Sequence, residues 1–215
     1  MGESALLKQI ARKGADAGAI ADKVIKNPRL LSEIFNGLRS DKARIKYGCD
    51  KVLRMLSEKD PEILYPKIDF FARQLDGNDT FFKWSAIRII ANLAAVDSKN
   101  KIERMFGKYF APVPGPVMIT AANVVGGAAE IALAKPKLTG RISSELLKVE
   151  KARYRTDECR NVVIGHAIRS FDRFFVQIKN KKPVITFIKR QLKNTRNATR
   201  KRAEEFIKKY GIDCL

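Results

Sequence analysis

The sequence predicts an all-α fold, an α-α superhelix formed as a short solenoid of about four to five helix pairs. Three observations lead to this prediction. Similar helix openings recur at intervals of 35 to 42 residues, which is close to the length of repeats built from helix pairs. Apolar residues follow most of these openings at helical spacing. No window has the alternating β-branched pattern that is typical of a strand.

The recurring openings are centred on Arg44, Lys83, Met118, Arg160 and Arg200, which are 39, 35, 42 and 40 residues apart. The residues after each opening predict one long helix per repeat, because apolar side chains recur three or four positions apart. These apolar residues are Val52, Leu53 and Leu56; Ile87, Ile90 and Leu93; Val124, Ala128 and Ile131; and Ile164, Ala167, Ile168 and Phe171.

A shorter amphipathic segment separates each long helix from the next, and we expect it to form the second helix of the pair. These segments cover residues 63–75, 102–109, 142–149 and 184–192. Proline and glycine mark the turns between the helices, because proline is tolerated in the first turn of a helix and not in its interior, and glycine favours turns. The breaks fall at Asp60-Pro61, Gly77 to Asp79, Pro112 to Pro116, Lys135-Pro136 and Lys182-Pro183.

The N-terminal residues form two or three shorter helical segments, over 5–11, 15–25 and 28–38, without the full repeat pattern. An open solenoid needs a cap, because its terminal repeat has a face without a neighbour. We therefore expect an N-terminal helical cap over residues 1–39 and a repeat solenoid over 40–210, as one continuous domain. Residues 211–215 are expected to be a C-terminal tail.

Three of the openings, Ala43-Arg44, Cys159-Arg160 and Thr199-Arg200, resemble the start of the first helix in HEAT repeats. There an apolar residue and an arginine are followed by small residues. The resemblance to this HEAT/armadillo-like family covers about residues 28–210, and Met118 departs from it because the other openings have a basic residue. It implies a solenoid whose second helices line a concave surface. It also implies that the opening arginines pair with nearby carboxylates, for which Asp41, Asp79 and Asp157 are placed.

Positive charge is the feature that bears on partners. The chain has 43 basic and 23 acidic residues, a formal net charge of +20. The excess is larger in the second half, since no acidic residue lies between Asp172 and Glu204. Such an imbalance predicts a macromolecular partner of opposite charge, either an acidic protein or a nucleic acid.

If the second helices line a concave surface, as the resemblance implies, their basic residues form a positive trough. Such a trough attracts phosphates through counterion release, and it equally attracts an acidic protein segment. The remaining alternative is a solvated surface without a partner. The residues that would form the trough are Lys67, Arg73, Lys101, Arg104, Lys108, Arg141, Lys148, Lys189, Arg190 and Lys193.

Other residues argue against catalysis and against a membrane span. No stretch approaches the roughly 20 apolar residues that a span needs. Cys49, Cys159 and Cys214 are too scattered for a disulfide framework, so a cytoplasmic location is expected. His166 is the single histidine, which excludes a multi-histidine metal site. We find no catalytic pairing of carboxylates, Cys/His or Ser/His/Asp, so no cofactor and no small-molecule substrate is expected.

These observations favour a non-enzymatic scaffold or adaptor that presents a basic concave surface to a protein partner. The alternative is a nucleic-acid-binding protein of HEAT-like architecture. A remote form of this alternative is a DNA glycosylase, because HEAT-like alkylpurine glycosylases use aromatic residues and an acidic residue in a basic groove. Trp84 and Asp79 are the residues that resemble such a site, although the chain has no second tryptophan.

Overall fold

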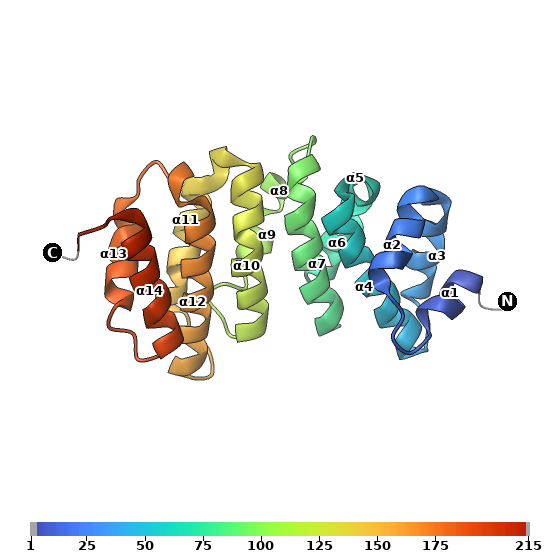
Figure 1. The fold of residues 1–215 in the computed structure, drawn as a ribbon, viewed down its shortest axis with the longest axis horizontal. Helices are drawn as coiled ribbons and strands as arrows, with labels where there is room; N and C mark the ends of the chain where they lie inside the picture. Colours follow the sequence, from blue (N-terminus) through green and yellow to red (C-terminus); the bar gives the residue numbers. More distant parts are fainter. Residues whose placement is uncertain (1–3, 214–215) are drawn as a thin grey trace. The chain divides into compact units, whose positions relative to one another are not determined.

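The computed structural model describes residues 4–213, and within them it contains helices and no β-strand (Figure 1). The predicted all-α class is therefore confirmed. The chain divides into two compact units, Met1–Lys99 and Asn100–Leu215. Long helices alternate along the chain with shorter helical segments, in the order that the repeat pattern predicts.

In the first unit, the long helix α4 packs against its neighbours α1, α2, α3 and α7. Short 3₁₀ segments at Pro28–Leu30, Tyr65–Lys67 and Leu93–Val96 join or extend the helices. The three predicted N-terminal segments are helical, and their role as a cap stays a prediction. The α-helices are α1 (Ala5–Ile10), α2 (Ala17–Lys26), α3 (Leu31–Gly37), α4 (Ala43–Lys59), α5 (Pro61–Leu64), α6 (Ile68–Gln74) and α7 (Thr80–Asn92).

Helix α4 shows how the sequence sets these elements. Its buried residues Ile45, Cys49, Val52 and Leu56 are spaced three or four apart, so they lie on one face of the helix. The helix ends at Lys59 because the next residue, Asp60, precedes a proline and adopts a non-helical conformation with φ of −148° and ψ of 77°.

In the second unit, α12 packs against α10 on one side and α14 on the other. Helix α14 approaches α12 closely at Gly165, where a Cβ atom would lie 2.8 Å from the Thr199 Oγ1 atom. The α-helices are α8 (Lys101–Arg104), α9 (Phe106–Phe110), α10 (Met118–Ala134), α11 (Thr139–Leu147), α12 (Asp157–Phe174), α13 (Lys182–Gln191) and α14 (Asn197–Tyr210).

Polar bonds join successive long helices within each unit. The Ser85 hydroxyl on α7 donates to Asp50 on α4 at 2.7 Å, and their sequence separation is 35 residues. The Ser170 hydroxyl on α12 donates to the Val125 carbonyl on α10, 45 residues away. The Thr199 hydroxyl on α14 donates to the carbonyl of residue 161, 38 residues away. The separations of 35 and 38 residues lie within the repeat interval of 35 to 42 residues, and the separation of 45 residues is slightly longer, so similar positions of neighbouring repeats meet in space.

Asp79 joins α4 to α7 in a second way. Its carboxylate accepts hydrogen bonds from the backbone N–H groups of Phe81 and Phe82 at the start of α7. It also forms a 3.0 Å ion pair with Lys46 on α4. The residue therefore caps one helix and holds it against another.

We expect Asp79→Ala to destabilise the protein by about 1 kcal/mol, the usual effect of losing a side-chain helix cap. Asp79→Asn keeps an oxygen acceptor for the cap and loses only the ion pair with Lys46, so it is expected to cost about half as much or less. Urea unfolding of both variants measures the difference. Equal losses of stability would show that the cap is unimportant.

Candidate functional site

The structure places the ten predicted trough residues in both units. Seven of them are exposed, and Lys101, Lys108 and Lys189 are half-buried. Lys67 and Arg73 lie in the first unit, at the two ends of α6. The other eight lie in the second unit, so a trough that joins both sets stays a prediction. Those eight are Lys101, Arg104, Lys108, Arg141, Lys148, Lys189, Arg190 and Lys193.

Arg190 is held by a carboxylate of the preceding repeat. Its Nε and Nη2 atoms donate to the two oxygens of Glu150 at 2.7 Å and 2.6 Å, a bidentate geometry. The Gln191 amide donates to the same carboxylate at 2.9 Å. The hydrogen bonds that Arg190 donates to the Glu150 carboxylate raise the pKa of Arg190 above its ordinary value. The pair neutralises much of the charge that Arg190 would offer to a partner.

Two other predicted residues also have carboxylate neighbours. Lys148 lies 2.7 Å from Glu145 within its own repeat. Arg141 lies 3.7 Å from Glu103 and stacks over the Phe106 ring, 4.2 Å from its centroid. Exposed ion pairs of this kind contribute about 0–1 kcal/mol to stability. Their main effect here is to reduce the local positive charge of the second unit.

The first unit contains a concave surface between α3 and α6, which we call the α3–α6 groove. Its cavity volume is about 940 Å³. Of the residues that the structure describes, four basic ones line it, all of them exposed, and no acidic one does. The groove combines residues around α3 with residues of α6 and one residue of α7. Its lining residues are Pro28, Arg29, Leu31, Ser32, Phe35, Asn36, Leu38, Arg39, Lys67, Phe70, Arg73, Gln74 and Phe82.

Aromatic side chains provide the apolar part of the groove. The rings of Phe35 on α3 and Phe70 on α6 meet edge to face, with centroids 5.1 Å apart. Phe82 lies beside them in the lining, and the Lys46 ammonium is 4.9 Å from its centroid. All three phenylalanines are half-buried, so part of each ring faces the groove.

Sequence reasoning found Lys67 and Arg73 and missed Arg29 and Arg39. The two arginines lie in the segment that was assigned to the cap, outside the repeats, and no pairing between that segment and α6 was expected. A signal was present, because Arg29 and Phe35 belong to an amphipathic segment over residues 28–38.

The expected pairing of the opening arginines with carboxylates is correct at one position and wrong at another. Arg160 forms a 2.7 Å ion pair with Asp157. Asp79 pairs with Lys46 and not with an opening arginine. Arg44 forms no ion pair with a carboxylate in residues 4–213; it lines a small cleft instead. On α4, Arg44 shares a helix face with Gly48 and Lys51, which line the same cleft.

Two side chains with reactive potential, Cys49 and Asp79, are held within the fold. Burial raises the pKa of the Cys49 thiol to about 12, which disfavours the nucleophilic thiolate. Burial alone would raise the pKa of Asp79, but the hydrogen bonds from Lys46, Phe82 and Phe81 outweigh it and lower that pKa. The Asp79 carboxylate is thus engaged within the fold. In residues 4–213 no group of three His, Cys, Asp or Glu side chains is placed to hold a metal ion.

Solved structures identify the architecture. A designed armadillo repeat protein matches with a TM-score of 0.60, 16% sequence identity, and coverage of 96% of this chain and 92% of its own. This chain has an armadillo-like helical-repeat fold. An engineered protein of known crystal structure matches with a TM-score of 0.54 and 12% identity, covering 95% of this chain and 87% of its own.

At such identities the armadillo-like resemblance concerns the fold alone. No model of a protein family matches the sequence, and no curated protein is significantly similar to it. Within residues 4–213, none of the helices of this armadillo-like chain has the length and apolar character that crossing a membrane requires.

Proposed function

We propose that this armadillo-like chain is a non-enzymatic scaffold that binds an acidic protein segment, with the α3–α6 groove as its principal site. The observation that carries the proposal is the composition of the groove: its described lining residues include four cations and three aromatic rings and no acidic side chain. The exposed basic residues of the second unit add long-range attraction.

The groove suits a peptide that combines acidic and apolar side chains. Carboxylates of the peptide would pair with Arg29, Arg39, Lys67 and Arg73, and apolar side chains would cover the phenylalanines. Interfaces of this kind have an apolar centre and a charged rim. The cavity volume of 940 Å³ is at the upper end of the range of about 300–1,000 Å³ for ligand pockets, so it has room for several side chains.

The aromatic geometry favours a protein over a single-stranded nucleic acid. Binding of single strands uses exposed aromatic faces on which bases stack. In the groove, Phe35 and Phe70 are half-buried and pack edge to face against each other, with an interplanar angle of 89°. Rings packed in this way can contact apolar side chains of a peptide, but their faces are not free for a base to stack on.

The proposal is tested by affinity capture of partners on the immobilised full chain, before and after nuclease treatment. We expect a stoichiometric protein partner that nuclease does not remove. The variant Arg39→Glu/Arg73→Glu should reduce its affinity at least about tenfold, equivalent to about 1.4 kcal/mol, since each reversal places a negative charge against the acidic segment.

The matched control is Lys201→Glu/Lys208→Glu, which changes the net charge equally at exposed positions on α14. It should alter the affinity less than threefold at physiological salt. Equal losses in both variants would contradict a groove-specific site and indicate general attraction by charge. Complete loss of the captured material on nuclease treatment would indicate the nucleic-acid alternative.

A further inference from the structure

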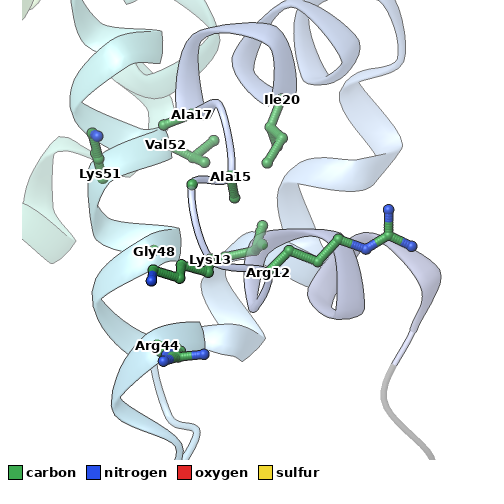
Figure 2. Close-up of a pocket in the computed structure, with 11 residues that line it drawn as sticks. Arg12, Lys13, Ala15, Ala17, Ile20, Arg44, Gly48, Lys51 and Val52 are labelled. Carbon is green, nitrogen blue, oxygen red and sulfur yellow. The ribbon is translucent and has the colours of Figure 1, made fainter.

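A second concave surface in the first unit contains unpaired positive charge. It lies between the loop that follows α1 and one face of α4, and its cavity volume is about 340 Å³ (Figure 2). We call it the α1–α4 cleft. Among residues 4–213, four basic residues and no acidic residue line it. Its lining residues are Ile10, Arg12, Lys13, Gly14, Ala15, Ala17, Ile20, Arg44, Gly48, Lys51 and Val52.

The α4 side of the cleft has a regular arrangement. Arg44, Gly48 and Lys51 are four and three residues apart, so they share one face of the helix. Gly48 carries no side chain between the two cations. A Cβ atom at this position would lie 2.4 Å from the Ile10 Cγ2 atom, so the end of α1 lies directly against α4 here. This packing of the Ile10 side chain against Gly48 holds the loop after α1 beside Arg44 and Lys51.

Lys13 adds a third cation from that loop. Figure 2 shows its side chain alongside the α4 face at Gly48, with Arg44 on one side and Lys51 on the other. The guanidinium of Arg12 points away from them. Gly14, at φ of +75°, follows Lys13 in the left-handed conformation that favours glycine and lets the chain turn toward α2.

These three cations have no carboxylate partner at ion-pair distance in the part of the chain that the structure describes. Asp16 is near enough for the charge of Lys51 to act on it. Its Oδ1 atom, however, accepts hydrogen bonds from Ala19 and Gly18 as the N-cap of α2, and these bonds lower its pKa. Three like charges around a small cleft repel one another, and a bound anion would relieve that repulsion.

We propose that Lys13, Arg44 and Lys51 form a binding site for the phosphate group of a small phosphate monoester. A dianionic phosphate fits the chemistry, because it accepts several charge-assisted hydrogen bonds at once, and arginine and lysine both bind it in proteins. The cleft also contains residues of α2, and the half-buried Ala15 in the loop before α2 leaves apolar surface beside the cations. The site is separate from the α3–α6 groove, since the two share no lining residue.

The test is an NMR titration of the ¹⁵N-labelled full chain with inorganic phosphate at pH 7.5 and constant ionic strength. We expect saturable shifts of amides in residues 12–15 and 44–51, with a dissociation constant in the millimolar range, about −4 kcal/mol. Arg44→Gln/Lys51→Gln should weaken binding at least about tenfold. Circular dichroism of the same variant checks that the fold is kept.

Two controls sharpen the result. Arg12→Gln removes a lining cation that points away, and Lys8→Gln/Lys26→Gln removes two exposed cations from α1 and α2. Both should change the dissociation constant less than threefold. No saturation by 20 mM phosphate, or equal weakening in the controls, would overturn the proposal. Titration with a sugar phosphate and with an otherwise neutral phosphoserine peptide distinguishes a metabolite from a modified protein as the source of the group.

Discussion

Leu53→Asp is expected to abolish cooperative folding of the first unit. Leu53 is 1% exposed on α4, the helix that packs against α1, α2, α3 and α7. Loss of a buried leucine costs about 2–5 kcal/mol, and an unpaired buried carboxylate adds a further penalty of several kcal/mol. The sum is comparable with the whole stability of a domain, about 5–15 kcal/mol.

Thermal and urea unfolding, followed by circular dichroism, measure this effect. Leu53→Met nearly keeps the volume and the apolar character, so it should cost less than about 1.5 kcal/mol. Ile164→Asp is the corresponding variant in the second unit, where Ile164 is 3% exposed on α12. A Leu53→Asp protein that melts within a few degrees of the parent would contradict the assignment of α4 to the core.

Asp50→Asn is expected to stabilise the protein above pH 6. Asp50 lies at the contact between α4 and α7, and burial raises its pKa from 3.8 to about 6. The hydrogen bond from Ser85 and the charge of Arg54, whose Nε atom is 3.7 Å away, lower the pKa of Asp50. Their combined effect is smaller than that of burial. The ionised carboxylate is therefore less stable in the folded protein than in the unfolded chain.

The sign of the pH dependence follows from that shift. The folded state binds the Asp50 proton more tightly than the unfolded state, so this residue contributes most to stability below pH 4. The contribution is lost as the pH rises to about 6, and the total loss is about 3 kcal/mol. Asparagine stays neutral and can still accept the hydrogen bond from Ser85. We expect it to gain about 2–3 kcal/mol at pH 7.5 and little at pH 4.

Urea unfolding of the parent and the variant at pH 4, 6 and 7.5 measures this difference. Asp41→Asn, which removes an exposed carboxyl before α4, is the matched control. A difference between Asp50→Asn and the parent that stays constant with pH would show that the buried carboxylate does not titrate in this range.

The fold could be predicted because apolar spacing and turn residues are local properties of the chain. The recurrence of openings near Arg44, Lys83 and Arg160 predicts the repeat, and the prolines predict where helices begin and end. The groove required more, because it depends on which short segments lie side by side. Arg39 belongs to the site only because α3 lies beside α6. The apolar periodicity within α3 or within α6 does not predict that the two helices lie side by side.

The charge pairs were the second kind of information missing from sequence reasoning. The trough prediction counted Arg190 as available, whereas Glu150, 40 residues earlier, binds it. Arg44 was expected to pair with a carboxylate and lines the α1–α4 cleft instead. The first outcome depends on a contact between neighbouring repeats and the second on a contact with the N-terminal segment, and reading each repeat alone reveals neither.

The bonds that join equivalent positions of neighbouring repeats have a consequence for how this sequence can change during evolution. Glu130 binds Arg173, Glu150 binds Arg190, and Asp172 binds Lys209, at separations of 43, 40 and 37 residues. Substitution of one partner leaves the other without its counter-charge. In related sequences, we therefore expect each pair to covary at a distance of one repeat, and an insertion inside a repeat to be tolerated only in the turns. Duplication or deletion of a whole repeat would preserve the pattern of partners.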